Sequence, residues 1–168
     1  MNKEHNMKYR LFLGLTAAFL LGGFGLAHAR LAVIDLTEGG RQPMASPCGR
    51  WVIAFNGEIY NFQEKRAMLE QEGYTFASHS DTEVILALYD KYQERCLDHL
   101  RGMFAFVIYD EQKQTVFCAR DRVGKKPFKY YIDDEVVLFA SELKSILTQP
   151  EYHREPDYVA IHHYLTLQ

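Results

Sequence analysis

Short apolar runs recur along the chain, separated by polar segments that contain glycine, proline or asparagine. Runs of about four to eight residues bounded by such turn signals fit β-strands. The pattern predicts strands at residues 31–35, 51–55, 104–109, 115–120 and 136–140. The polar stretch 110–114 joins two of these runs, and it therefore predicts the turn of an antiparallel hairpin.

Helices are predicted where a capping signal comes before a run of helix-forming residues. Residues 61–71 begin with Asn-x-x-Glu and end before Gly73, and residues 80–92 begin with Ser-x-x-Glu and carry an apolar stripe. Both beginnings have the spacing of a capping box, and glycine commonly follows the last turn of a helix. Two shorter helices are predicted at 142–147 and 157–165. Helices grouped between strands, with one hairpin, predict an α+β fold built in layers.

Composition narrows the function classes. The 168 residues fit one domain, and 48% hydrophobic residues exclude a disordered chain. The formal net charge of -3 provides no basic footprint for a nucleic-acid partner. Cys48, Cys96 and Cys118 lie far apart and outside any Cys-x-x-Cys pair, so neither a metal site nor a disulfide framework is expected. No glycine-rich phosphate-binding motif is present, so we expect no nucleotide or other cofactor in this chain.

The first 29 residues differ from the rest and resemble a leader. Residues 11–27 carry no charged side chain, a basic segment at 1–10 comes before them, and Ala-His-Ala follows at 27–29. These are the three parts of a secretory signal peptide. The apolar run is short for a membrane-spanning helix, and a buried helix or strand of the domain is the alternative. The sequence therefore divides into a leader at 1–29 and a domain at 30–168.

Three polar segments have both a functional and a structural interpretation. Asn56 and Gly57 follow a predicted strand, where an amide and a backbone N–H suit an oxyanion hole, but Asn-Gly is also a common turn. Asp81 suits an ammonium ligand, and it equally suits the start of a helix. The loop 120–127 holds four cations and one acid, which fits an anion site or a solvated turn. From these residues alone, the turn and the helix start are favoured.

The order of seven segments adds a resemblance to a known family. In chain order they are RLAVIDL (30–36), QPM (42–44), FNGEIYN (55–61), SDTEVIL (80–86), LRGMFAF (100–106), ARDRVGKKP (119–127) and FASELK (139–144). The chain resembles the class II glutamine amidotransferase family, and within it the N-terminal glutaminase domain of glutamine-hydrolysing asparagine synthetases. The resemblance covers about residues 25–168.

This resemblance implies a fold and an activity. The fold is of the N-terminal-nucleophile hydrolase type, with two stacked, mainly antiparallel sheets between helical layers. Such domains release ammonia from glutamine for asparagine synthesis, through an N-terminal cysteine whose own α-amine acts as the base. The ammonia passes to a second domain, which activates aspartate with ATP and Mg²⁺. The resemblance also implies a cytoplasmic protein, whereas the leader leaves export or membrane tethering open.

The resemblance further implies roles for eight residues. Arg30 would hold the α-carboxylate of glutamine, because a guanidinium fork matches a carboxylate. Asn56 and the Gly57 N–H would form the oxyanion hole, and they would act together with two carboxylates, Glu58 and Asp81, that fix the amino group. The pocket would be lined by Leu31, Val33 and Ile34.

Two departures from the family shape the expectation for this chain. First, the family's initial Cys-Gly-Ile and a later Arg-Gly-Pro-Asp run are absent, and Cys48 is the first cysteine. Second, the sequence stops at Gln168, about where the resemblance places the start of the synthetase domain. We therefore expect a domain truncated at both ends, without the nucleophile and without the ATP-dependent domain. Such a chain is expected to be catalytically inactive by itself. A separate synthetase subunit is then an expected partner. The alternative is a non-catalytic module that binds glutamine or a protein partner. The leader, rich in Gly, Leu and Phe, is expected to fit the missing strands poorly.

Overall fold

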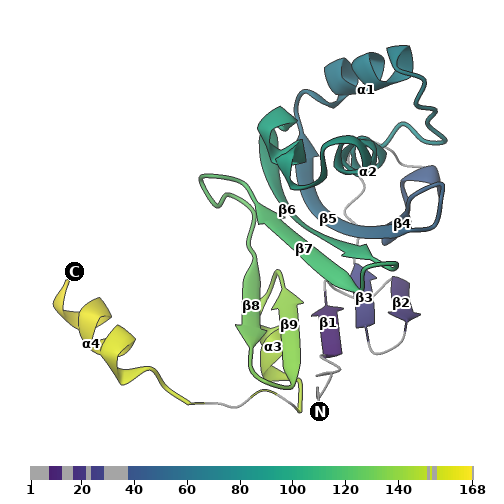
Figure 1. Ribbon diagram of the computed structural model, residues 1–168. Helices are drawn as coiled ribbons and strands as arrows, with labels where there is room; N and C mark the ends of the chain where they lie inside the picture. The colour runs from purple at the N-terminus through teal and green to yellow at the C-terminus, as the bar shows by residue number, and fades with distance from the viewer. Residues whose placement is uncertain are drawn as a thin grey trace.

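The chain forms two stacked β-sheets that lie between helices (Figure 1). The computed structural model describes residues 8–12, 17–21, 24–28, 38–150, 152 and 155–167. One sheet has four strands in the order β4-β5-β6-β7, and the other has five in the order β2-β3-β1-β9-β8. The strands are β1 (Lys8–Phe12), β2 (Ala17–Leu21), β3 (Phe24–His28), β4 (Met44–Ala45), β5 (Trp51–Ile59), β6 (Gly102–Asp110), β7 (Thr115–Arg120), β8 (Lys129–Ile132) and β9 (Val136–Ala140).

The four-stranded sheet is antiparallel and centres on the long pair β5 and β6. Their register runs without a bulge from Trp51 opposite Asp110 to Ile59 opposite Gly102. Ile53 and its alternate neighbours pack toward the helices, whereas Ala54 packs toward the other sheet. Because both faces are covered, these strands are apolar at nearly every position rather than at every second one.

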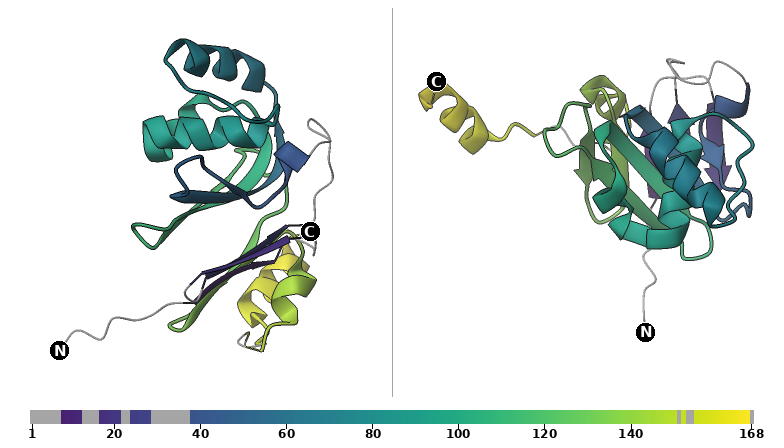
Figure 2. Two further views of the ribbon diagram at one scale, coloured as in Figure 1. Left: turned by 90° about the vertical axis from the view of Figure 1, so that its right-hand side faces the viewer. Right: turned by 90° about the horizontal axis from the view of Figure 1, so that it is seen from above.

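Two helices and a 3-10 segment cover the outer face of this sheet. They are α1 (Phe62–Gln71), α2 (Asp81–Tyr92) and η2 (Gln93–His99), and a shorter 3-10 turn, η1 (Glu38–Gly40), comes before β4. Ile85 and Leu88 of α2 are fully buried against the sheet, and Leu69 is the buried residue of α1. Figure 2 shows α2 lying between the sheet and α1.

The five-stranded sheet is mixed, with β1 in its middle. β1 runs parallel to both of its neighbours, β3 and β9, and Phe12 pairs with Ala140. Leu26 of β3, together with Val137 and Phe139 of β9, packs against the four-stranded sheet. The other face of β9 packs against α3 (Leu143–Leu147), where Ile146 is buried. The resulting order of layers is helix, sheet, sheet, helix.

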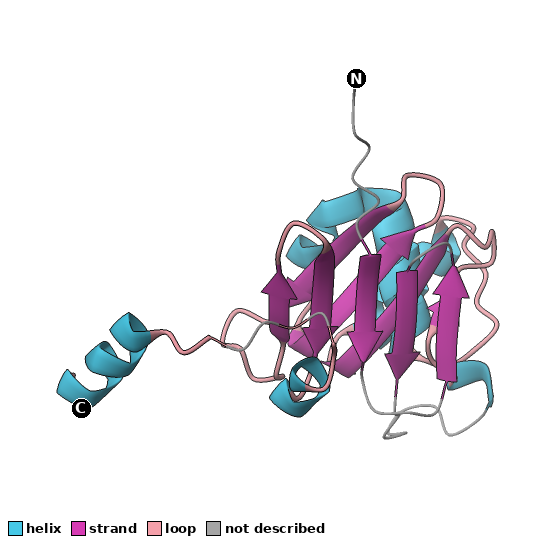
Figure 3. Cartoon of the chain, turned by 90° about the horizontal axis from the view of Figure 1, so that it is seen from below, coloured by secondary structure: helices cyan, strands magenta, loops and turns pink. Residues whose placement is uncertain are grey.

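The last helix, α4 (Tyr158–Thr166), projects away from these layers (Figure 3). Its Asp157 N-cap accepts a hydrogen bond from the Ala160 N–H, and no residue of the helix is buried. Within the described part of the chain, no helix has the length and apolarity that crossing a membrane requires.

Most predicted elements are confirmed, with instructive exceptions. The strands at 115–120 and 136–140 match β7 and β9, and the strand at 104–109 lies within β6. β8 was not predicted, because it is an edge strand with mostly exposed side chains and no apolar run. The strand predicted at 31–35 lies outside the described residues.

The two predicted capping boxes have different outcomes. The Ser80 hydroxyl caps α2 by accepting from the Thr82 N–H. Asn61 is at the N-cap of α1 but makes no cap hydrogen bond, so that capping box was wrong. Its amide instead donates to the His99 carbonyl and accepts from the Arg101 N–H, both 2.9 Å away. Hydrogen bonds to residues distant in sequence therefore take the place of the local cap of α1.

The leader contributes strands to the fold. β1, β2 and β3 all lie within the first 29 residues, and Leu26 is 1% exposed in the core between the sheets. The expectation that this segment fits strands poorly was wrong: β3 places Leu26 and Ala27, which point to opposite faces of the sheet, in buried positions. Ala29, at the end of the suggested cleavage site, lies outside the described residues, and the signal peptide stays a prediction.

Candidate active site

The candidate site lies along the edge of β5, just beyond the point where β4 ends. β4 pairs only with Val52 and Ile53. Further along this edge, two side chains take over the backbone donors. The Phe55 N–H donates to Oε1 of Gln42 at 2.6 Å, and the Ile59 N–H donates to Oδ2 of Asp81 at 3.0 Å. This end of β5 is thus held by a loop and by the start of α2.

Gly57 lies between these two anchored positions. In an antiparallel strand, alternate residues direct their backbone groups to the same edge. The N–H groups of Phe55 and Ile59 point away from β6, and the Gly57 N–H therefore points to the same edge between them. The predicted turn at Asn56 and Gly57 is wrong, because β5 continues through both residues. The strand geometry directs the Gly57 donor toward the candidate site.

Close approach of β5 and β6 explains why glycine occupies this position. A Cβ on Gly57 would collide with the Met103 carbonyl oxygen and lie 2.7 Å from Cα of Phe104. The same holds on the facing strand, where a Cβ on Gly102 would collide with the Glu58 carbonyl oxygen. Since the colliding atoms belong to the backbone, they cannot move aside cheaply. Two glycines therefore permit tight pairing at the site end of the sheet.

Asn56 lies on the face of β5 that is directed toward the other sheet. It alternates with Ala54, which packs between the sheets. Its Nδ2 donates to Oγ of Ser141, which directly follows β9, at 3.4 Å. The half-buried amide therefore lies where one end of each sheet meets the other. A carboxamide and a backbone N–H on successive residues can both donate to one oxygen that carries negative charge.

Asp81 begins α2 and is 5% exposed. Burial raises the pKa of its carboxyl group, whereas the backbone hydrogen bond from Ile59 lowers it and the charge of nearby Glu58 raises it further. Within the described residues, no ion pair joins Asp81 to a cation. Two carboxylates close together, with no described cation paired to Asp81, suit a positively charged ligand group.

The structure brings together half of the predicted site residues. Asn56, Gly57, Glu58 and Asp81 all lie at one end of β5. The four others, Arg30, Leu31, Val33 and Ile34, lie outside the described residues. Roles in substrate binding and catalysis stay predictions for all eight.

Two residues at the site were not predicted as site residues. Gln42 holds the edge of β5, and Ser141 contacts the Asn56 amide. Both belong to segments that carried the resemblance, QPM and FASELK. No spacing rule marks them, because their contacts join residues 13 and 85 positions apart.

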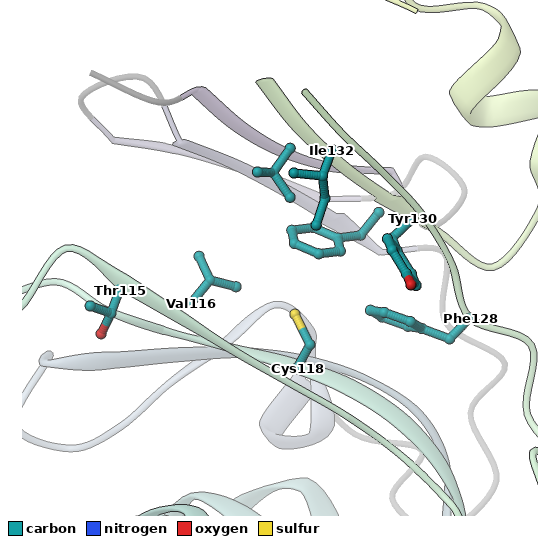
Figure 4. Close-up of a pocket in the computed structure, with 8 residues that line it drawn as sticks. Thr115, Val116, Cys118, Phe128, Tyr130 and Ile132 are labelled. Carbon is teal, nitrogen blue, oxygen red and sulfur yellow. The ribbon is translucent and has the colours of Figure 1, made fainter. Parts of the chain in front are cut away.

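The three cysteines lie away from Asn56. Cys96 is buried in the core beneath the helices, and burial raises its pKa to about 12. Cys118 of β7 lines an open cavity of about 530 Å³ between β7 and β8, and burial raises its pKa to about 12 as well (Figure 4). Cys48 is exposed beyond the opposite end of β5, where a hydrogen bond with Ser46 lowers its pKa. The thiols of Cys96 and Cys118 are therefore protonated at neutral pH and are poor nucleophiles.

The cavity that Cys118 lines is apolar and separate from the polar residues around Gly57. Its lining side chains come from the two edge strands and from β9, and they include Val116, Phe128 and Phe139. No group of three His, Cys, Asp or Glu side chains among the described residues is arranged to hold a metal ion.

Comparison with known proteins identifies relatives of this chain. The chain is 47% identical over 132 residues to asparagine synthetase [glutamine-hydrolyzing] 3 of Bacillus subtilis (strain 168), with 77% of this chain and 21% of the relative covered. It is 44% identical over 144 residues to asparagine synthetase [glutamine-hydrolyzing] 1 of the same organism, with 86% and 22% covered. The chain thus spans about a fifth of the length of these relatives.

A solved structure shares the fold. The glutamine phosphoribosylpyrophosphate amidotransferase of B. subtilis, complexed with ADP and GMP, superposes with a TM-score of 0.55 and 26% identity, covering 65% of this chain and 25% of that one. This likeness confirms the predicted N-terminal-nucleophile hydrolase type of fold. The family described as "Glutamine amidotransferase domain" matches residues 15–168. The chain belongs to the glutamine amidotransferase domain family.

Proposed function

We propose that this chain is a glutaminase-type domain of an asparagine synthetase and that it binds glutamine along the edge of β5. One observation carries the proposal: two carboxylates and two potential oxyanion donors lie together at the end of one strand, with Asp81 buried and free of any ion pair to a described cation. Glutamine offers the complementary groups, an ammonium and an amide carbonyl.

Each end of glutamine has a partner in this arrangement. Asp81 and Glu58 bind the α-ammonium group, and its charge offsets the cost of keeping the buried carboxylate ionised. Asn56 and the Gly57 N–H donate to the side-chain carbonyl oxygen, which becomes an oxyanion in the tetrahedral intermediate of amide hydrolysis. Arg30 binds the α-carboxylate, and Leu31, Val33 and Ile34 line the pocket.

The ammonia from such a domain requires an acceptor. The two B. subtilis relatives are named asparagine synthetases and are about five times as long as the part this chain matches. We propose that the partner is a synthetase domain or subunit that uses ATP and Mg²⁺, and that this domain itself holds neither. The reaction here is glutamine plus water to glutamate plus ammonia.

We further propose that the 168-residue polypeptide binds glutamine without hydrolysing it. The mechanism implied for this family needs a thiol and an α-amine on one residue. None of the three thiols lies beside Asn56. β1 also enters the sheet at the far end, since Lys8 pairs with Val136 and lies about 13 Å along the strand from the Ala140 end. A binding domain that requires another source of nucleophile fits both observations.

Calorimetric titration of the 168-residue polypeptide with L-glutamine tests the binding proposal. We expect saturable binding that Asp81→Asn weakens at least tenfold, because the ammonium loses a charged partner. Asp98→Asn is the matched control, since Asp98 is exposed on η2, and it should leave the affinity unchanged. Absence of binding by the unmodified chain would refute the proposal.

A coupled ammonia assay tests the second part separately. We expect no release of ammonia from glutamine above that of a variant whose three cysteines are replaced by serine. Turnover that disappears when thiols are blocked would show that one of the three cysteines is a nucleophile, against the placement described above. Binding with no turnover supports both parts together.

A further inference from the structure

Gln42 joins the two elements that form the candidate site. Its side chain is 7% exposed, and both ends of its amide are used. Oε1 accepts from the Phe55 N–H at 2.6 Å, and Nε2 donates to Oγ1 of Thr82 at 3.3 Å. One partner belongs to β5 and the other to the first turn of α2, so a single side chain connects strand and helix.

These contacts form a closed ring of residues that includes Gly57. The ring runs from Gln42 to Phe55, along β5 to Ile59, across to Asp81 and through Thr82 back to Gln42. Gly57 is the middle residue of the enclosed stretch of strand. Asp81 binds the Ile59 end of this stretch and Gln42 the Phe55 end, both at the same edge of β5, so the ring fixes the position of the Gly57 N–H relative to the Asp81 carboxylate.

At position 42, a glutamine side chain fits these contacts better than the side chains most similar to it. Methionine has similar length but leaves the buried Phe55 N–H without an acceptor, and a buried donor without a partner is destabilising. Glutamate keeps the acceptor but loses the donor to Thr82, and it adds a charge beside the buried Asp81. Of these three side chains, only the amide both accepts and donates without adding charge.

We propose that Gln42 is a positioning residue of the glutamine site. It holds the Phe55–Ile59 edge of β5 against the N-terminus of α2, and thereby sets the spacing between the Gly57 donor and the Asp81 carboxylate. This inference rests on the proposed function, because the spacing matters only if one ligand spans both groups. Gln42 itself does not contact the ligand.

Glutamine titration of Gln42→Met, far below its melting temperature, tests this role. We expect the dissociation constant to rise at least tenfold, and hydrogen exchange at the Phe55 amide to accelerate. Gln112→Met is the matched control, because Gln112 is exposed on the hairpin turn, and it should change neither quantity. A lower melting temperature with an unchanged dissociation constant would show that Gln42 only stabilises the fold, and would overturn the proposal.

The other end of the amide gives an independent test that a general loss of stability would not reproduce. Thr82→Val removes the acceptor of the Gln42 Nε2 and should weaken glutamine binding, whereas Thr82→Ser keeps the hydroxyl and should restore it. In Gln42→Glu, lowering the pH protonates the introduced carboxyl, supplies a donor to Thr82 and should partly recover the affinity relative to the unmodified chain at the same pH. Equal affinities for Thr82→Val and Thr82→Ser would contradict the proposal.

The failure of this inference is distinguishable from that of the proposed function. If the unmodified chain does not bind glutamine, the proposed function fails and the positioning role falls with it. If the unmodified chain binds glutamine and Gln42→Met binds equally well, only the positioning role is wrong.

Discussion

A buried aspartate lies at each end of the β5–β6 pair, Asp110 on β6 and Asp81 at the start of α2, and the surroundings shift their pKa values in opposite directions. At the Trp51 end, Asp110 is 2% exposed and forms an ion pair with Arg50, with 2.7 Å between Nη2 and Oδ2. Nε1 of Trp51 also donates to it at 3.3 Å. The hydrogen bond from Arg50 is the largest cause that lowers the pKa of Asp110 to about 2.

At the other end, Asp81 is buried to a similar degree but has no ion pair with a described cation, and burial raises its pKa. The same side chain is therefore stabilised in its charged form at one end and destabilised at the other. A fold gains stability from the first arrangement and gains nothing from the second. We infer that the Trp51 end serves stability and that the Asp81 end serves a ligand.

Gly57→Ala should have the largest effect, because it would separate the strands at the site end. Its Cβ would meet the backbone of Met103 and Phe104, so we expect a loss of about 3 kcal/mol in the free energy of unfolding, together with loss of glutamine binding. Gly73→Ala is the control: nothing lies within 4 Å, and only its positive φ of 95° opposes alanine, at about 1 kcal/mol. Urea unfolding measures both, and equal losses would contradict the close-approach argument.

Asp110→Asn should remove the stabilising ion pair with Arg50 at the Trp51 end of the sheet. The pKa of Asp110 lies at about 2 in the folded chain against an ordinary 3.8, which corresponds to about 2 kcal/mol of stability at neutral pH. Because the folded-state pKa is lowered, this stability is present above about pH 4 and lost as the pH falls toward 2. Urea unfolding at pH 7 and pH 2 should show the difference between unmodified chain and variant shrinking, while glutamine affinity at pH 7 stays unchanged.

Asp81→Asn should have the opposite effects, changing stability little and weakening glutamine binding strongly. The pKa of Asp81 is raised, so this carboxyl stabilises the fold at low pH and loses that contribution as the pH rises through its folded-state pKa. The uncharged variant should therefore unfold at pH 7 with a free energy within about 1 kcal/mol of the unmodified chain, or slightly higher. Glutamine affinity falls at least tenfold. A large loss of stability with unchanged affinity would place Asp81 in the same class as Asp110.

The sequence predicts the central strands well because each buried strand is a continuous apolar run that can be recognised without knowing its neighbours in space. Runs such as 136–140 are apolar throughout, and the strand follows from that run alone. Asn56 and Gly57 mislead for a physical reason: their local preference for a turn is overridden by nine residues of pairing with β6. Asn61 misleads in the same way, since its amide binds the His99 carbonyl of η2 and the Arg101 N–H just before β6 rather than its own helix.

The candidate site was predictable only in part. The residue types of Asp81 and Asn56 suit ammonium and oxyanion binding, and the order of seven segments favours these roles over the structural interpretations. Gln42 and Ser141 carry no such signal, because each acts through a contact that exists only after distant segments meet. Long-range hydrogen bonds to a site leave no periodic signal in a single sequence.

Ser141→Ala should have the smallest effect on stability, and it tests what orients the Asn56 amide at the site end of the sheet. The 3.4 Å contact between Nδ2 of Asn56 and Oγ of Ser141 is long for a hydrogen bond and half-buried, so its loss should cost well under 1 kcal/mol in the free energy of unfolding. If Asn56 faces the ligand carbonyl, a freed amide samples more orientations and the dissociation constant of glutamine should rise about twofold to fivefold. Thr148→Ala is the control, because that exposed hydroxyl donates only within the last turn of α3. Unchanged affinity, with Asn56→Ala still weakening binding, would mean that Asn56 is oriented by β5 alone.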